Sequence, residues 1–388
     1  MAPRRRIRIL IVDDSAVMRN LLRSVVCTDP ALEVAGTAAD GASALSSLGV
    51  LLPDLVLLDV EMPVMDGLVT LRELRRRGHK MPVIMCSSLT QRGAKVTLEA
   101  LAGGASDYVA KPAGHANREE AMRALSQDLG PRIHALAGSG PVSHPPSPFQ
   151  ASLPAGASFP VGSRPPLFLS SAQPHRPQAI QSRPTVLVIG VSTGGPAALD
   201  VLLPALPGNF PLPVLIVQHM PELFTKLFAE RLDGRCRLRV REAAEGDPVR
   251  PGTIFIARGN WHMEVVAAAR TGAPPTLRLH QGPLENHCRP AVDVLFRSAA
   301  AVYGPGTLAV VLTGMGSDGM LGCRTIREHG GAVIAQDQAS STVWGMPGAV
   351  TNAGLAHRVL SLGDIAPEIL RLISRTHSEA SELRESMV

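Results

Sequence analysis

The chain has 388 residues and a mass of 40.9 kDa, which is long enough for two or three domains. Hydrophobic residues make up 45% of it and charged residues 18%, so there is enough apolar material for packed cores and the chain as a whole is not disordered. The net charge is +5, but neither of the two long parts of the chain is basic. Residues 1–128 carry 16 basic and 15 acidic side chains, and residues 185–388 carry 18 of each. This balance argues against nucleic-acid binding.

The first residues resemble a secretory signal but do not complete one. Three arginines at positions 4–6 precede the mostly apolar stretch 7–12, which Asp13 ends after six residues, too few for a signal-peptide core. No apolar run reaches the roughly 18 residues of a membrane helix. Five single cysteines without a CxxC pair indicate reduced thiols rather than disulfides or a zinc site. We therefore expect a cytoplasmic protein with no membrane insertion.

The first part of the chain, residues 7–128, alternates short apolar runs with amphipathic stretches. Buried strands are predicted at residues 7–12, 55–58, 83–86 and 107–110, and helical spacing follows at 18–25, 68–76 and 94–102. Continuous apolar strands separated by helices predict a doubly wound parallel sheet covered on both faces.

Polar side chains follow these strands where each one ends: Asp13 and Asp14, then Asp59, Ser87 and Lys111. The carboxyl ends of parallel strands meet at one edge of the sheet, where ligands bind. Three converging carboxylates repel one another, and Mg²⁺ with oxygen ligands resolves that repulsion. An aspartate beside Mg²⁺ and a lysine can accept a phosphoryl group. Taken singly, each aspartate is also a plausible helix N-cap.

This part of the sequence resembles a response-regulator receiver domain, through the stretches LIVDDS, LLDVEMPVMDG, MCSS and DYVAKP. The resemblance implies a flavodoxin-like fold phosphorylated by a sensor histidine kinase. It also implies the residue roles: Asp59 as phospho-acceptor, Asp13 and Asp14 as Mg²⁺ carboxylates together with Asp59, Lys111 as the phosphate-binding lysine, and Ser87 and Tyr108 as switch positions.

Residues 129–184 differ abruptly in composition from both neighbours. Residues 141–184 hold eleven of the 33 prolines, among Ser, Gly and Ala, with no helix or strand periodicity. Each proline removes a backbone donor and fixes φ. The segment is predicted to be a flexible linker.

The second part, residues 185–380, repeats the α/β pattern with different loops. Strands are predicted at residues 185–189, 214–217, 308–312 and 332–335, and helices at 197–206 and 223–231. The pattern predicts a second doubly wound parallel sheet, of Rossmann-like type, joined to the first by the linker.

The first loop of this second sheet has the form GxSxG, with Ser192 between Gly190 and Gly194. A serine on a sharp strand-to-helix turn can act as a nucleophile, and the N–H groups of the helix start favour an oxyanion. A glycine-rich loop that binds phosphate or another anion is the alternative. A nucleophile needs a base and a group that orients the base. His219 follows the strand at 214–217 and Asp318 lies in the loop after 308–312, although a lone His at such a position is often an ordinary loop residue.

The loop that contains Asp318 has a competing interpretation. Residues 314–319 read GxGxxG after a strand, with Asp337 following 18 residues after Gly319, which is similar to a dinucleotide-binding fingerprint. Asp318 would, however, place a carboxylate where the pyrophosphate should lie, and the strand does not open its domain. We therefore favour the hydrolase interpretation.

The chain order Ser192, His219, Asp318 differs from that of α/β-hydrolases. It resembles the CheB family of chemotaxis methylesterases, through VIGVSTGGP, VQHMP, HMEV, RPAVDVLFRSAA, LTGMGSDGMLG and VWGMPGAV. The resemblance implies that these three residues form a triad and that Met315 lies in the oxyanion loop. It implies demethylation of methylglutamate on methyl-accepting chemoreceptors, deamidation of glutamine, and no cofactor for the esterase. A non-catalytic receiver-containing signalling adaptor is the alternative.

The sequence departs from the family pattern at two positions. Cys288 stands where the family often has histidine, and Arg258 where proline is common. Both departures are expected to alter the substrate groove without touching the triad. The architecture also predicts that the unphosphorylated receiver domain docks over the edge with Ser192, and that phosphorylation of Asp59 weakens the docking.

Overall fold

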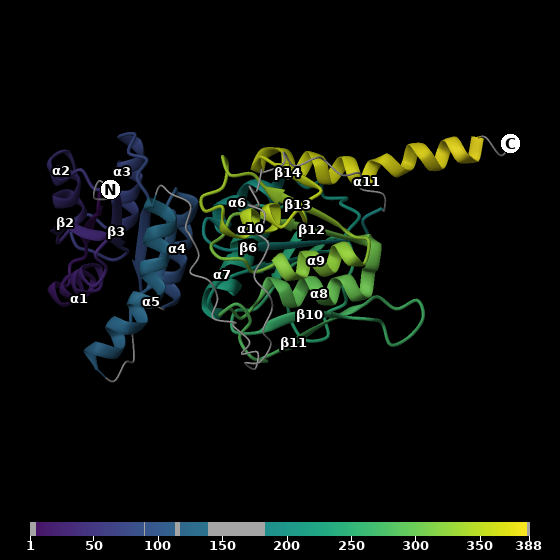
Figure 1. Cartoon of the computed structure of the whole chain (residues 1–388), viewed down its shortest axis with the longest axis horizontal. Helices are drawn as coiled ribbons and strands as arrows, with labels where there is room; N and C mark the ends of the chain where they lie inside the picture. The colour runs from purple at the N-terminus through teal and green to yellow at the C-terminus, as the bar shows by residue number, and fades with distance from the viewer. Residues whose placement is uncertain (1–4, 89, 113–116, 139–182, 386–388) are drawn as a thin grey trace, which may run out of the picture.

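A computed structural model describes residues 5–88, 90–112, 117–138 and 183–385 of the chain. Over these ranges the chain forms two α/β units, which lie side by side in Figure 1. Each is built on a parallel sheet with helices on both faces, as the sequence predicts. None of the helices in these ranges is both long enough and apolar enough to cross a bilayer.

The first sheet has the strand order β2-β1-β3-β4-β5, with every neighbouring pair parallel. Successive side chains of a strand face opposite sides, so Ile9 and Ile11 pack under α1 and α5 while Leu10 and Val12 face α2, α3 and α4. The elements are β1 (Ile7–Val12), α1 (Ala16–Cys27), β2 (Leu32–Ala38), α2 (Gly41–Leu51), β3 (Leu55–Asp59), α3 (Gly67–Arg76), β4 (Val83–Ser87), α4 (Gln91–Ala102), β5 (Asp107–Ala110) and α5 (Arg118–Ala137).

Helix α5 corrects the predicted start of the linker. We expected residues 129–184 to lack regular structure, but α5 continues to Ala137 with Pro131 inside it. Leu129 and Ile133 are fully buried on either side of that proline, and their packing against the sheet outweighs the one backbone hydrogen bond that proline cannot make. The rest of the predicted linker, residues 139–182, lies outside the described residues.

The second sheet has the order β14-β13-β12-β6-β7-β9-β8 and is also parallel throughout. Helices α6, α7 and α11 cover one face, and α8, α9 and α10 the other. The elements are β6 (Val186–Val191), α6 (Gly195–Leu202), β7 (Val214–Gln218), α7 (Glu222–Asp233), β8 (Arg239–Glu242), β9 (Thr253–Ile256), β10 (His262–Val266), β11 (Thr276–His280), α8 (Val292–Tyr303), β12 (Thr307–Val311), α9 (Met320–Glu328), β13 (Ala332–Gln336), α10 (Gly345–Asn352), β14 (Arg358–Leu360) and α11 (Leu362–Glu385).

The strand order reverses direction at β6, with β7 on one side of it and β12 on the other. Such a switch point leaves a crevice at the carboxyl ends of the strands, where ligands bind in open α/β sheets. The antiparallel hairpin β10–β11 was not predicted and stands apart from the main sheet.

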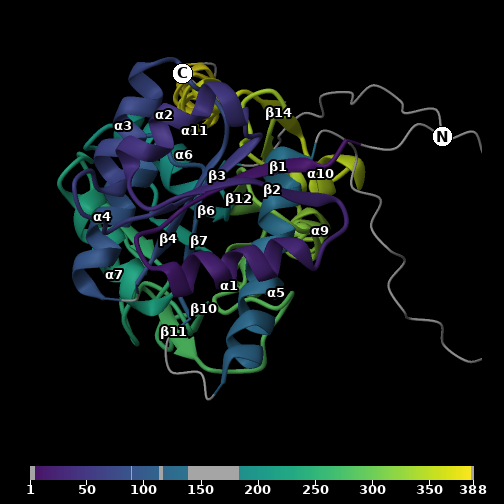
Figure 2. The ribbon, with the colours of Figure 1, turned by 90° about the vertical axis from the view of Figure 1, so that its left-hand side faces the viewer.

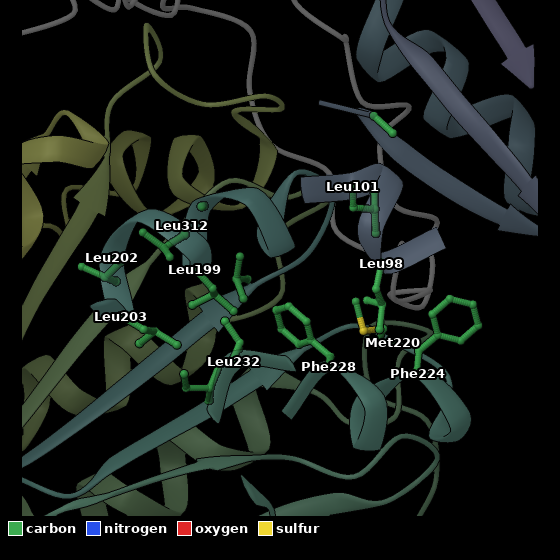
Figure 3. Packing of buried hydrophobic residues seen from close by; sticks show 14 of the residues in the cluster. Leu98, Leu101, Leu199, Leu202, Leu203, Met220, Phe224, Phe228, Leu232 and Leu312 are labelled. Carbon is green, nitrogen blue, oxygen red and sulfur yellow. The ribbon is translucent and has the colours of Figure 1, made fainter. Parts of the chain in front are cut away.

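The two units meet along one face of the first. Helix α4 packs against α6 and α7, and Figure 2 looks through the first sheet toward the second. Leu98 and Leu101 of α4 point toward Met220 and Phe224 in Figure 3, and all four side chains are buried. The ring of Tyr108, from β5, stacks on Phe224 with 4.7 Å between centroids and 15° between planes. The part of the interface that these side chains form is therefore apolar and continuous with the core of both units.

Candidate active site and phosphorylation site

The carboxylates of the first sheet converge at its carboxyl edge as predicted. One ligand oxygen from each of Asp13, Asp14 and Asp59 lies within 4.8 Å of the others. The Nζ of Lys111 lies 2.8 Å from Asp13 Oδ2 and 2.7 Å from Asp59 Oδ1. Asp13 and Asp59 are buried, whereas Asp14 is exposed. Three carboxylates with one open side fit a hard divalent cation that keeps some of its water.

The electrostatics of this cluster favour capture of positive charge. Burial raises the pKa of Asp59 above its ordinary value, and the ion pair with Lys111 opposes that shift without cancelling it. Burial would lower the pKa of Lys111, but its contacts with Asp13 and Asp59 raise it, so the amine stays charged. A lysine ammonium is a point charge of the kind that binds phosphate oxygens.

The two predicted switch residues lie on adjacent strands that end beside Asp59. Ser87 is fully buried, and its backbone oxygen accepts a hydrogen bond of 2.8 Å from Lys111 N. By the register of β4 with β5, Tyr108 lies on the same face of the sheet as Ser87, and its ring packs into the interface with Phe224. The residue before it, Asp107, accepts a 2.6 Å hydrogen bond from Arg132 of α5. A change at Asp59 therefore has a short path to the interface through β4 and β5.

Ser192 lies between β6 and α6, where three strand ends fix its backbone. Its N–H donates to Thr313 O at 3.0 Å, and its carbonyl oxygen accepts from Gln218 Nε2 at 3.0 Å. Gly194 starts α6 with φ of 77°, a left-handed conformation that side chains other than glycine rarely adopt. The sharp turn leaves the Ser192 side chain half-buried at the helix N-terminus.

The loop after β12 lies directly against Ser192. A Cβ at Gly314 would come within 2.9 Å of Ser192 Cβ, so only glycine permits this approach. Met315 follows Gly314 in this loop and has a half-buried side chain. The competing interpretation, a dinucleotide-binding loop, needs the Asp337 carboxylate for the nucleotide. That carboxylate instead accepts hydrogen bonds from Ser340 in its own turn.

His219 and Asp318 form a buried hydrogen-bonded pair at the same edge. The backbone N–H of His219 donates to Val191 O, next to Ser192, at 3.2 Å. Its Nε2 lies 2.8 Å from Asp318 Oδ2, which makes the carboxylate the acceptor and Nε2 the protonated nitrogen. The loops after β6, β7 and β12 thus bring Ser192, His219 and Asp318 together across about 130 residues of sequence.

Asp318 stays ionised although it is only 2% exposed. Its Oδ2 accepts from Val292 N at 2.7 Å and its Oδ1 from Asp293 N at 3.0 Å. These N–H groups open α8, whose N-cap Ala291 supplies no side-chain hydrogen bond, so Asp318 takes the place of the missing cap. Burial alone would raise the pKa of Asp318, but the hydrogen bonds from His219 and from α8 hold it below its usual value.

The second nitrogen of the imidazole contacts a thiol. Cys288 Sγ lies 3.7 Å from His219 Nδ1, the nitrogen that remains for Ser192. The expectation that Cys288 would not touch the triad is therefore wrong, because a tight turn at residues 285–288 brings it back over the histidine. Within the described ranges no hydrogen bond joins the Ser192 hydroxyl to His219. Catalytic hydrogen bonds are often incomplete before substrate binds.

Burial alone would lower the pKa of His219, but its hydrogen bonds to Asp318 and Cys288 hold it well above the ordinary value of a histidine. These contacts favour the protonated imidazole, which would have to lose a proton before it could act as a base toward Ser192.

Both α/β units match known protein families. Two protein-family models match the chain, "Response regulator receiver domain" over residues 9–123 and "CheB methylesterase" over residues 187–369. A protein-glutamate methylesterase/protein-glutamine glutaminase of Nocardioides sp. is 50% identical over 369 residues, or 95% of this chain and 96% of that protein. The protein of the same name from Trichodesmium erythraeum is 44% identical over 366 residues, or 94% and 99%. The chain belongs to the CheB family.

Among solved structures, the CheB methylesterase catalytic domain of Thermotoga maritima is 42% identical, covers 49% of this chain and 100% of that chain, and has a TM-score of 0.47.

The second departure from the CheB pattern, Arg258, hydrogen-bonds Glu222 at the start of α7 and lies 5.5 Å above the ring of Trp261. This contact lies on the surface, and within the described residues no hydrogen bond joins Arg258 to His219 or Asp318.

Sequence reasoning missed two residues that the structure places at this site, Thr193 and Asn286. Thr193 is buried and donates to Asp107 Oδ2 at 2.7 Å, which links the residue after Ser192 to the receiver unit. Asn286 donates to Asp318 Oδ1 at 2.9 Å. No strand-end rule points to them, because both contacts depend on how loops and domains pack.

Proposed function

We propose that Ser192, His219 and Asp318 hydrolyse the methyl esters of glutamate side chains on chemoreceptors, and deamidate glutamine side chains at the same centre. The enzyme class follows from membership of the CheB family. The residue roles rest on the pairing of His219 with Asp318 at the edge that presents Ser192. A methyl ester and a primary amide offer the same acyl carbon and differ in the leaving group.

In the proposed reaction His219 takes the hydroxyl proton as Ser192 Oγ bonds to the acyl carbon. The tetrahedral intermediate collapses, the C–O bond to the methoxy group breaks, and His219 gives its proton to the departing methanol. A water molecule then attacks the acyl-enzyme with His219 again as base, which releases the glutamate carboxylate and restores the Ser192 hydroxyl. With glutamine, ammonia leaves instead of methanol.

The negative charge of the intermediate needs donors beside Ser192. The start of α6 provides backbone N–H groups and the positive end of a helix dipole at this place. The Gly314–Met315 loop lies close enough to complete the pocket. We assign the oxyanion site to these two segments, with Met315 in the loop that helps to build it.

The first unit is proposed to regulate the esterase by phosphorylation at Asp59, with a sensor histidine kinase as phosphodonor in the cytoplasm. Asp13, Asp14 and Asp59 would hold Mg²⁺, since their oxygens converge within 4.8 Å. When bound, the ion neutralises charge on the transferring phosphoryl group. Lys111, close to Asp13 and Asp59, is placed to bind the phosphoryl oxygens, and Ser87 and Tyr108 are the proposed switch residues.

The experiment that tests this proposal is release of methanol from methyl-labelled receptor membranes by the purified full-length protein. Steady release separates the esterase from the alternative, a non-catalytic signalling adaptor. A folded protein that binds the membranes but releases no methanol would support the adaptor instead.

Replacing Asp318 by asparagine is expected to lower the rate of methanol release by about 10⁴-fold, because the amide no longer holds the imidazole in its reactive tautomer. The loss should be smaller than that caused by removing the nucleophile. Steady-state rates on labelled membranes measure it. A variant with more than half of the normal rate would remove Asp318 from the triad.

Replacing Cys288 by alanine removes one of the two hydrogen bonds that raise the pKa of His219. A base with a lower pKa loses its proton at lower pH, so the rise of kcat with pH should move toward lower pH. A pH–rate profile checks the shift. Cys236→Ala is the matched control, because Cys236 is another half-buried cysteine, free and outside the triad. Equal profiles for Cys288→Ala and the wild type would show that the thiol does not tune the base.

A further inference from the structure

The chain between β11 and α8 makes one tight turn over the triad. Glu285 N donates to Cys288 O at 3.1 Å and Cys288 N to Glu285 O at 2.8 Å, so the two residues are paired like the ends of a hairpin. Asn286 and His287 between them have φ of 52° and 62°. Two positive φ values define a type I′ turn, in which asparagine is favoured. Arg297 of α8 holds the turn through two hydrogen bonds to the Glu285 carboxylate, of 2.5 and 2.7 Å.

The side chain of Asn286 bridges two buried carboxylates. Its Nδ2 lies 2.9 Å from Asp318 Oδ1 and 2.9 Å from Asp293 Oδ2. A side-chain amide nitrogen has two hydrogens, so each carboxylate receives one of them. No other side-chain donor in the described ranges reaches both acids.

Each of these acids also caps a helix. Asp318 accepts from the first N–H groups of α8, and Asp293 Oδ1 accepts from Gly322 N in the first turn of α9 at 2.6 Å. Asp293 is 1% exposed. Burial, together with the charge of Asp318, raises the pKa of Asp293 to about 6, although its hydrogen bonds oppose the shift. Two like charges are therefore held close together, and a donor between them stabilises both.

We propose that Asn286 is a positioning residue for the esterase, which aligns Asp318 on His219 by bridging it to Asp293. The inference rests on the proposed triad and names a residue that never touches the substrate. Without the amide, Asp318 Oδ1 keeps only one donor, Asp293 N, and faces Asp293 with no hydrogen between them. One of the two acids then binds a proton more readily, and a protonated or turned Asp318 no longer orients the imidazole.

Other charged groups face the same pair of acids and set the background of any pH effect. They are His219 after β7, Glu285 and Cys288 in the turn, Arg297 on α8 and Cys323 on α9. Among the residues that the structure describes, only Asn286 joins the two carboxylates directly. Asn286 is uncharged, so its replacement alters this pair without adding or removing a charge.

The test uses the full-length protein with Asn286→Gly, because glycine keeps the positive φ of the turn while removing the amide. Asn286 lies on the surface, so its removal takes no atoms from the core. His287→Gly is the matched control: it has the same kind of backbone conformation in the same turn, and its side chain is exposed. Both variants are also made in an Asp318→Asn background.

Loss of a hydrogen bond to a charged group should lower kcat for methanol release by about 10- to 100-fold in Asn286→Gly. KM should change little, because Asn286 never touches the substrate. His287→Gly should behave like the wild type. In the Asp318→Asn background, Asn286→Gly should have almost no further effect on kcat, because the charge that it positions is gone.

An unchanged kcat in Asn286→Gly, or an equal loss with and without Asp318, would overturn the positioning role. Absence of activity in the wild type would instead overturn the proposed function.

Discussion

Ser192→Ala is expected to lower the turnover of methylated receptor by about a million-fold, the usual cost of removing the nucleophile of a triad. The backbone of Ser192 is fixed by Thr313 and Gln218 and not by its own hydroxyl. The substitution should therefore leave the loop and the fold in place. Labelled methanol released per enzyme molecule is the measurement.

The control for this variant is phosphorylation of its first unit. Ser192→Ala should still accept phosphate from a small phosphodonor at Asp59, since the carboxylate cluster lies on the other sheet. Near-normal methanol release from a folded, phosphorylatable Ser192→Ala protein would contradict the assignment of the nucleophile.

Removing residues 1–184 is expected to raise basal methanol release from receptor by at least about tenfold, which corresponds to a docking bias of about 1.4 kcal/mol. The receiver unit lies against the edge that carries Ser192, where Thr193 is only 4% exposed and is bonded to Asp107. Its loss uncovers Phe224 and the Ser192 loop for a bulky protein substrate. The rate per molecule for the two forms on the same membranes measures the effect.

Asp59→Ala in the full-length chain gives the complementary result. It should keep the low basal rate and should not respond to a phosphodonor that stimulates the wild type, because the phospho-acceptor is absent. If the shortened protein were no faster than the unphosphorylated full-length form, inhibition by occlusion would be wrong. The receiver would then act by direct activation or by recruitment to the receptors.

The sheets could be predicted because their strands are buried on both faces. Val214–Gln218 and Thr307–Val311 have no exposed side chain, and their apolar runs are visible in the sequence. The strand β8 was missed because it lies at the sheet edge, where Arg239 is exposed and Val240 is buried in alternation. Helix α5 was not predicted, and the predicted linker began inside it, because Pro131 is a local signal while the packing that overrides it is tertiary.

The candidate site likewise contains residues that could be predicted from the sequence and residues that could not. Ser192, His219 and Asp318 follow strands, and the topology of a parallel sheet carries all three to one edge. Asn286 and Cys288 reach Asp318 and His219 through a turn whose path depends on an ion pair with Arg297, which no periodicity encodes. The contact between Thr193 and Asp107 requires two domains to be docked, so the sequence of either one alone does not contain it.

The most direct test of the whole account is one assay on one protein. Purified full-length wild-type chain is mixed with methyl-labelled receptor membranes from its own cell, and labelled methanol is followed before and after a small phosphodonor and Mg²⁺ are added. The account predicts slow release at first and a clear increase after phosphorylation. Absence of methanol under both conditions, from a protein that becomes phosphorylated, would contradict it.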